Sequence, residues 1–281
     1  MISMKYEIID TTHPASSQLR RIRALRDIPT AGVKAEDLGG WVESEHNLAQ
    51  SGEAWVGGEA AVFGRAVVRN AALVRGEAWV SSKAIVSDSA RVHGSARVYG
   101  NARVSGKALV CSEARVYGSA IVQGDALVCS EAVVGGSAIV SGNAQVYGSA
   151  IVGGNAQVQD EARVSGEAMV YDRAQVYGNA LVADNARVHG NAVVKSSEDI
   201  MYSMVITSGT YSSTLHRTTD GHLLTVGRWR GTVPEFRTMI ESDTWVEATP
   251  EQIELRRPEL LAFASMCEAR VAAWEQSEEN K

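Results

Sequence analysis

The apolar residues in the middle of the chain follow a period of six. From Glu53 to Ser196 the chain divides into 24 units of six residues. Every unit has Ala at its second position and Val at its fourth, and the residue between them varies. The sixth position is Gly in 15 units and Asn, Asp or Ser in the other nine. A period this regular determines the fold before any local propensity is considered.

The Ala-x-Val triplet predicts a short strand. Residues two apart on a strand share a face, so Ala and Val point to the same side. The Gly, Asn, Asp or Ser that ends each unit suits a bend with positive φ. The chain therefore winds into a coil of short strands and corners, with strands stacked about 4.8 Å apart. A helix is excluded, because a six-residue period does not keep one face of a 3.6-residue helix apolar.

The run Val56-Gly57-Gly58-Glu59-Ala60 and its successors resemble the hexapeptide-repeat family. The resemblance implies a mainly β fold, a left-handed triangular parallel β-helix with three units per coil and hence about eight coils. Many members of that family are CoA-dependent acyltransferases that work as trimers, whereas others are not enzymes. The segments 23–27 and 38–44 resemble the entry segment of YdcK-like putative transferases from bacterial and prophage genomes.

Three parts of the chain are expected: an N-terminal cap over 1–52, the β-helix over 53–196, and a C-terminal α+β domain over 197–281. In the cap, 4–9 reads as a strand and 19–26 as a strand or a short helix. Trp41 is expected to cover the first coil, because an open β-helix end exposes both core and unpaired strand.

The C-terminal domain is predicted to contain strands, a tight turn and two helices. The strands are expected at 204–209, 213–217 and 223–227, with a hairpin turn at 219–222. Thr232 is expected to cap a helix that runs to Ser242. A second helix begins at Pro250 and runs to Trp274, with a break at Pro258.

Residues 18 positions apart are expected to stack, so the position between Ala and Val forms three outward columns. One column reads Val67, Ile85, Arg103, Ile121, Ile139, Gln157, Gln175 and Val193. Monomers rarely expose so much contiguous apolar surface, which predicts a homo-oligomer, with a trimer favoured. The alternative is that β-branched residues occupy strands by propensity alone.

Two groups of basic residues are candidate binding sites. Arg91, Arg97 and Arg103 lie on successive units, hence on three sides of one coil, and would bind a small anionic ligand if subunits formed a cleft there. The alternative is that they pair with corner carboxylates such as Asp88 and Glu113, or remain hydrated. Arg228, Trp229 and Arg230 form the second candidate; the alternative is that the Trp packs under its own hairpin.

Charge and cysteine content narrow the classes of function. The net charge is −6, and the repeat holds 13 basic and 12 acidic residues, which argues against a nucleic-acid binder. No apolar run of the length that spans a membrane is present, and no membrane partner is expected. Cys111 and Cys129 should stack within crosslinking distance. A reduced pair is nevertheless expected, because three cysteines are not a secreted framework and indicate a cytoplasmic protein.

The catalytic signal is weak. In enzymes of this fold a His near a subunit boundary acts as the base, and His93 is the candidate here. A loop that interrupts the coils usually helps to form their pocket, yet 53–196 has no interruption. No metal site, phosphate loop or nucleophile elbow is predicted.

Three hypotheses remain. The first is an oligomeric scaffold that displays its end domains to a protein partner, a host protein if the chain is phage-encoded. The second is an acyltransferase that uses acetyl-CoA, with His93 as base. The third is an anion binder that uses the band of arginines. No cofactor is expected apart from acetyl-CoA under the second hypothesis.

Overall fold

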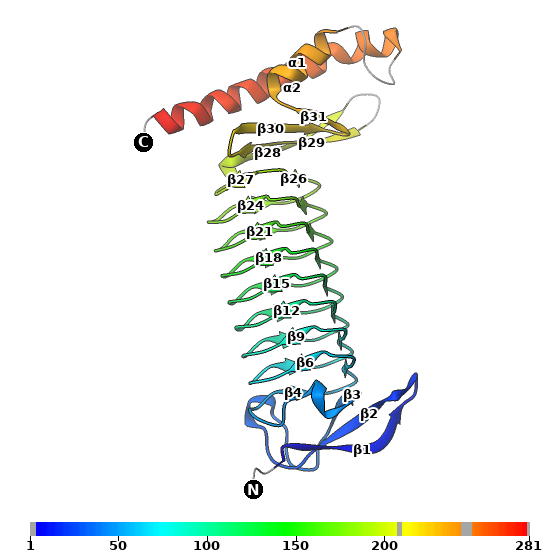
Figure 1. The fold of residues 1–281 in the computed structure, drawn as a ribbon. Helices are drawn as coiled ribbons and strands as arrows, with labels where there is room; N and C mark the ends of the chain where they lie inside the picture. Colours follow the sequence, from blue (N-terminus) through cyan, green and yellow to red (C-terminus); the bar gives the residue numbers. More distant parts are fainter. Residues whose placement is uncertain (1–3, 207–209, 243–248, 280–281) are drawn as a thin grey trace.

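A parallel β-solenoid forms the middle of the molecule (Figure 1). The computed structural model describes residues 4–206, 210–242 and 249–279. The 24 units form 24 two-residue strands, and each of the first 21 pairs in parallel with the strand 18 residues further on. The predicted parallel β-helix is therefore confirmed, while its left-handed sense and triangular section stay predictions.

Three sheets run along the solenoid. The second sheet contains β4 (Trp55–Val56), β7 (Leu73–Val74), β10 (Arg91–Val92), β13 (Leu109–Val110), β16 (Leu127–Val128), β19 (Gln145–Val146), β22 (Arg163–Val164) and β25 (Leu181–Val182). The third sheet contains β6 (Val67–Val68), β9 (Ile85–Val86), β12 (Arg103–Val104), β15 (Ile121–Val122), β18 (Ile139–Val140), β21 (Gln157–Val158), β24 (Gln175–Val176) and β27 (Val193–Val194).

The first sheet is longer, because strands of the N-terminal segment join it. Its order is β1-β2-β3-β5-β8-β11-β14-β17-β20-β23-β26. The solenoid strands in it are β5 (Ala61–Val62), β8 (Trp79–Val80), β11 (Arg97–Val98), β14 (Arg115–Val116), β17 (Val133–Val134), β20 (Ile151–Val152), β23 (Met169–Val170) and β26 (Arg187–Val188).

The core of the solenoid is built from the repeated Ala and Val. Every fourth-position Val from Val56 to Val194 has no exposed surface, and the second-position Ala residues are equally buried. Backbone N–H groups donate to carbonyls of the next turn at almost every strand, for example Arg91 N to Ala108 O at 2.9 Å. The fold thus pairs its backbone groups along the rod and keeps only small side chains inside it.

The corners have the backbone conformation that the sequence predicts. All 15 sixth-position glycines have φ between 61° and 75°, and eight of the nine other residues there have φ between 57° and 63°. The exception is Ser196, with φ −147°, because it ends the repeat and caps the short helix η3 (Ser197–Asp199). Where Asp occupies a corner, its carboxylate can accept a hydrogen bond from the backbone N–H one turn on, as Asp88 does from Gly106.

The N-terminal segment contributes a further turn, which makes about nine. β3 (Leu38–Val42) pairs in parallel with β5, with Trp41 opposite Ala61, and Leu48 forms a parallel bridge with Val68. Each of these pairs is 20 residues apart, so this turn carries two extra residues. The expectation that Trp41 covers the first coil is therefore corrected, because Trp41 belongs to β3, which continues the first sheet by one more turn.

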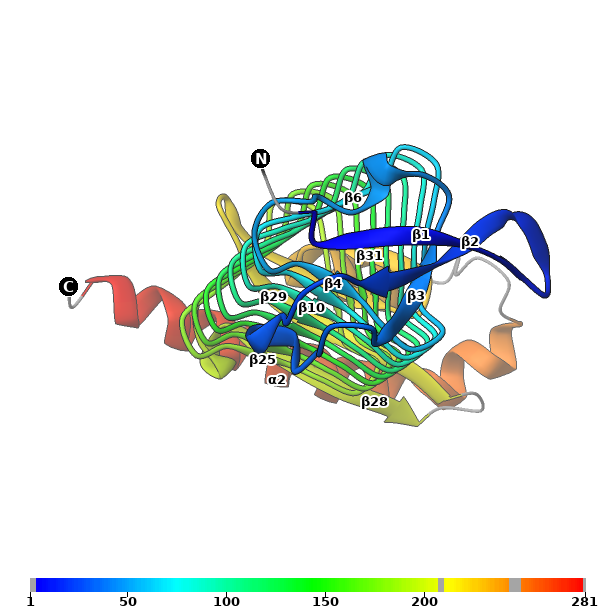
Figure 2. The same cartoon turned by 90° about the horizontal axis from the view of Figure 1, so that it is seen from below.

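A β-hairpin closes the N-terminal end of the solenoid (Figure 2). β1 (Tyr6–His13) pairs antiparallel with β2 (Ser16–Ala24), and β2 pairs antiparallel with β3. The segment 19–26 is thus mostly strand rather than helix. Short helices η1 (Pro29–Ala31) and η2 (Glu45–Asn47) lie between and after these strands. The ammonium group of Lys5, which is fully buried, donates to the carbonyls of Ala49 and Ala54.

A four-stranded antiparallel sheet and two helices cover the C-terminal end (Figure 1). The strands are β28 (Ile200–Ile206), β29 (Thr210–Thr218), β30 (Gly221–Val226) and β31 (Trp229–Gly231). The helices are α1 (Val233–Glu241) and α2 (Pro250–Glu279). The hairpin turn is confirmed at 219–220, and residues 207–209 of the predicted strand lie outside the described residues.

Helix α1 begins as predicted, because Thr232 and Glu235 form a reciprocal capping box. The predicted break at Pro258 is wrong, since α2 is continuous through that residue. No helix in the described part of the chain is both long and apolar enough to span a membrane.

Candidate functional site

The band of arginines lies on three different sheets. Arg91 is on β10, Arg97 on β11 and Arg103 on β12, and all three side chains are exposed. Each strand belongs to a separate sheet, so one chain does not bring the three guanidinium groups to a common ligand. Only neighbouring subunits would bring them together.

In the part of the chain that the structure describes, these arginines do not pair with corner carboxylates as predicted. Asp88 instead accepts hydrogen bonds from Asn70 Nδ2, at 2.9 Å, and from Gly106 N, at 3.1 Å. The Arg97 guanidinium carbon lies 5.8 Å from the centre of the Trp79 ring, a cation–π contact. Within the described residues the side chains of Arg91 and Arg103 make no ion pair or hydrogen bond.

A groove of about 590 Å³ lies between helix η1 and the second sheet. Its lining comprises Pro29, Thr30, Ala31, Gly32, Leu73, Arg75, Arg91, Val92, His93 and Leu109. Leu73, Arg91 and Leu109 are direct neighbours on β7, β10 and β13, so they form its floor. The Arg75 guanidinium donates to the Ala31 carbonyl and holds the wall of this η1 groove in place.

His93, the candidate base, is exposed and lines the η1 groove beside Arg91. It stands at the corner that follows Val92, and its backbone N–H donates to Val110 O at 2.9 Å. No side-chain hydrogen bond orients its imidazole among the described residues. The structure thus places His93 where a ligand can reach it, without the orienting partner that a catalytic His usually has.

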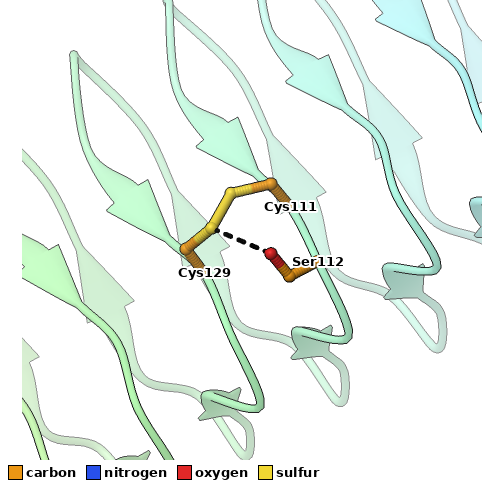
Figure 3. The surroundings of a disulfide bond; sticks show 3 residues. All are labelled: Cys111, Ser112 and Cys129. Atoms are coloured by element: carbon orange, nitrogen blue, oxygen red, sulfur yellow. Dashed lines mark hydrogen bonds between the residues drawn. A yellow bond between two sulfur atoms is a disulfide. The ribbon is translucent and has the colours of Figure 1, made fainter.

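Cys111 and Cys129 occupy the same corner column as His93 and are joined by a disulfide (Figure 3). The parallel turns hold their Cα atoms 4.7 Å apart, within the range that a disulfide spans. The hydroxyl of Ser112 lies 3.4 Å from Cys129 Sγ. The reduced pair expected from the sequence is therefore wrong for this structure, since the spacing of the turns brings the two thiols into bonding position.

The C-terminal cluster 228–230 has mainly a packing role. The Trp229 ring lies 4.9 Å from that of Phe236, so it packs against helix α1. Arg230 donates to Tyr171 Oη at 2.7 Å and lies over the Tyr171 ring. Arg228 is exposed in the turn before β31. Two of the three predicted ligand residues therefore help to build the domain and attach it to the solenoid.

A buried polar layer, which sequence reasoning missed, joins the last turn to the C-terminal sheet. Arg187 N donates to Thr214 Oγ1 at 2.9 Å, and His189 Nε2 lies 2.8 Å from Thr225 Oγ1. His216 is fully buried and packs edge-on against His189, which is only 3% exposed. In the solenoid, the backbone N–H groups of one turn donate to the carbonyls of the next turn. At the last turn the side chains of this layer replace those carbonyls as acceptors.

The environment of this layer favours neutral imidazoles. Burial, and secondarily Arg230, lowers the pKa of His189 to about 4. Burial likewise lowers the pKa of His216 to about 4, against a hydrogen bond to the Arg217 carbonyl that raises it. Within the described residues, no three His, Cys, Asp or Glu side chains are grouped as metal ligands.

Comparison with known proteins supports the repeat assignment. No curated protein matches the chain. The family model described as the YdcK β-solenoid repeat matches residues 96–112 and 174–190, two stretches of the solenoid. These two matches, together with the continuous parallel solenoid that contains them, support the likeness of the repeat to the YdcK β-solenoid.

Proposed function

We propose that this protein is a rigid scaffold that associates with copies of itself through the third sheet and displays its end domains to a protein partner. The outward column of that sheet contains one charged residue, Arg103, among eight. Around Ile121 and Ile139 the flanking corner residues are also uncharged, and comprise Ser119, Gln123, Ser137 and Ser141.

The scarcity of charge on this face is the observation that carries the proposal. Interface cores are depleted of charged residues, because burying an unpaired charge costs more than burying an apolar or amide group. Ile121 and Ile139 are half-exposed in the single chain and lie opposite each other on β15 and β18. A second copy would cover them without facing a like charge. A trimer is the state that the resemblance to the hexapeptide-repeat family favours.

Light scattering at micromolar concentration tests the association. We expect an oligomer for the wild type and a monomer for Ile139→Lys, which places a charge in the centre of the face. Ile151→Lys is the matched control, because Ile151 holds the same strand position on the first sheet and is 37% exposed. A monomeric wild type, or equal dissociation by both variants, would refute the proposed interface.

The partner and setting belong to the same proposal. The resemblance to proteins from prophage genomes supports a phage-encoded chain that meets a host protein in the bacterial cytoplasm. The two ends of the rod, the hairpin β1–β2 and the C-terminal domain, are the surfaces that differ most from the repeat. Binding of a host protein should therefore be lost when either end is altered and retained in Ile151→Lys, which changes the first sheet of the solenoid between the two ends.

Acyl transfer is a second candidate function, favoured by the position of His93. The imidazole is exposed in the η1 groove, where an acceptor could reach it. Protection by acetyl-CoA in a thermal-shift assay, lost in His93→Ala, would support this function. Absence of acetyl-CoA binding at millimolar concentration would exclude it.

Anion binding between subunits is a third candidate, and it requires the oligomer. The exposed guanidinium groups of Arg91 and Arg103, which lack carboxylate partners among the described residues, favour it. A salt-sensitive titration with an anion, abolished by substitution of Arg91, Arg97 and Arg103 by Ala, is the test. Binding that survives the triple substitution would exclude this band as the site.

A further inference from the structure

We propose that the η1 groove binds a small organic carboxylate that carries an apolar group, within a single chain. The groove combines one exposed guanidinium with apolar side chains on both sides of it. Leu73 and Leu109 are the register neighbours of Arg91, so each lies about 4.8 Å from it along the sheet. A ligand whose carboxylate binds Arg91 would therefore place its apolar group against Leu73 or Leu109.

The charge of the lining favours an anion. Arg75, Arg91 and His93 line the groove, and no Asp or Glu among the described residues does. The Arg75 guanidinium is engaged by the Ala31 carbonyl, which makes it part of the wall. Arg91 is different, because its side chain has no hydrogen-bond or ion-pair partner within the described residues. Its fork of N–H donors matches a carboxylate in a bidentate arrangement.

The size and shape of the groove set the class of ligand. A volume of about 590 Å³ falls within the range of small-molecule sites. Leu73 is 7% exposed and Leu109 is half-buried, so the floor is apolar and partly shielded from water. One available guanidinium suits a monoanion better than a phosphate dianion, whose second charge would lack a partner. An aliphatic or aromatic monocarboxylate fits both the charge and the floor.

This site differs from the cleft between subunits that would use all three arginines of the band. It needs neither Arg97 nor Arg103, and neither a second copy nor the third sheet. The Ile139→Lys variant should bind the carboxylate as well as the wild type does. Failure of self-association and failure of this site are therefore distinguishable.

The test is a calorimetric titration of the full chain with hexanoate at low salt. Hexanol, acetate and hexyl phosphate are the comparison ligands, which separate the contributions of charge, apolar group and head group. We expect saturable binding of hexanoate that weakens with salt, and weaker binding of the other three. Arg91→Gln should reduce the affinity roughly tenfold or more, because a charge-assisted bidentate contact is lost.

Arg163→Gln is the matched control, since Arg163 is exposed in the same column of the second sheet, far along the rod from η1. It should leave hexanoate binding unchanged. Equal loss in both variants would show nonspecific charge attraction and overturn the site. No saturable binding up to about 10 mM would also overturn it. Tighter binding of hexyl phosphate than of hexanoate would overturn the carboxylate class.

Discussion

Acid should loosen the C-terminal domain from the solenoid, because His189 and His216 are held neutral in the layer between them. In the folded chain both histidines have a pKa of about 4, below the ordinary value of 6.5. The groups facing His189 are Arg187, Arg230, Asp172 and His216. Those facing His216 include His189 and His222, with the Arg217 carbonyl. Burial is the main cause of both low pKa values, and the neighbouring Arg and His side chains add to it, while Asp172 opposes it at His189.

The sign of the effect follows from linkage. A folded-state pKa below the unfolded value means that the unfolded chain takes up protons more readily as the pH falls. The stabilisation is complete above pH 6.5 and declines as the pH falls toward 4. One pH unit below the unfolded pKa, each histidine removes about 1.4 kcal/mol, or about 3 kcal/mol for the pair if they act independently.

Urea denaturation at pH values between 7.5 and 4.5 measures this loss of unfolding free energy. Hydrogen exchange of β28–β31 over the same range shows whether the C-terminal domain is the part that opens. The variant with both His189→Gln and His216→Gln removes the titrating groups, so its stability should fall less over the same range. His93→Gln is the control, because it removes an exposed histidine at the equivalent place in the repeat. If the double variant loses as much stability as the wild type between pH 6.5 and 5.5, the reasoning is refuted.

Three further predictions concern corners, crosslink and buried ammonium. Gly118→Ala should lower the free energy of unfolding by at least about 2 kcal/mol, because φ is +70° and a Cβ would lie 2.6 Å from the Gly136 carbonyl oxygen. Gly153→Ala is the control: its Cβ would meet no atom within 4 Å, so its thermal melt should match that of the wild type. Replacing Cys111 and Cys129 by Ser should lower stability by at most about 3 kcal/mol, the value for a loop of 18 residues. Reductant should lower the urea midpoint of the wild type and leave that of the double Ser variant unchanged. An unchanged wild-type midpoint would contradict this prediction. Lys5→Met should cost about 2 kcal/mol in chemical denaturation, since a buried carbonyl of Ala54 and a part-buried one of Ala49 lose their donor, and a neutral result would be evidence against that pairing.

The solenoid was predictable because its determinants are local and repeated. Side-chain alternation places the fourth-position Val inside, and the sixth position selects residues that tolerate positive φ. Neither inference needs knowledge of distant contacts. The stacking of Tyr99 on Tyr117, with ring centres 5.3 Å apart, followed from the 18-residue spacing alone.

The first turn and the η1 groove were not predictable from the same period. The first turn pairs at an offset of 20 residues, which hides it from a search in sixes. The sequence feature that marks this turn is the pair Gly39-Gly40, where the chain packs too closely for a side chain. A Cβ on Gly39 would lie 2.6 Å from the Trp55 ring, and one on Gly40 would lie 2.5 Å from the Ala60 oxygen. The groove depends on where the loop carrying η1 packs, and no repeat encodes that position.

The layer of histidines was missed for a related reason. His189 follows the rule of the repeat, but the residues that bury it come from β29 and β30. Their contact with the last turn joins positions 27 to 36 residues apart, without any common period. No pattern in the sequence therefore predicts that His189 and His216 are in contact.

Since every turn of the repeat adds 18 residues and about 4.8 Å, the number of turns works as a molecular ruler. About nine turns separate the two ends by about 40 Å. Excision of residues 137–154 would remove one complete turn, restore the register on both sides and bring the ends one step closer. Duplication or deletion of one 18-residue turn in the gene can therefore change the distance between the two end domains by one step of about 4.8 Å, without any new packing inside the solenoid.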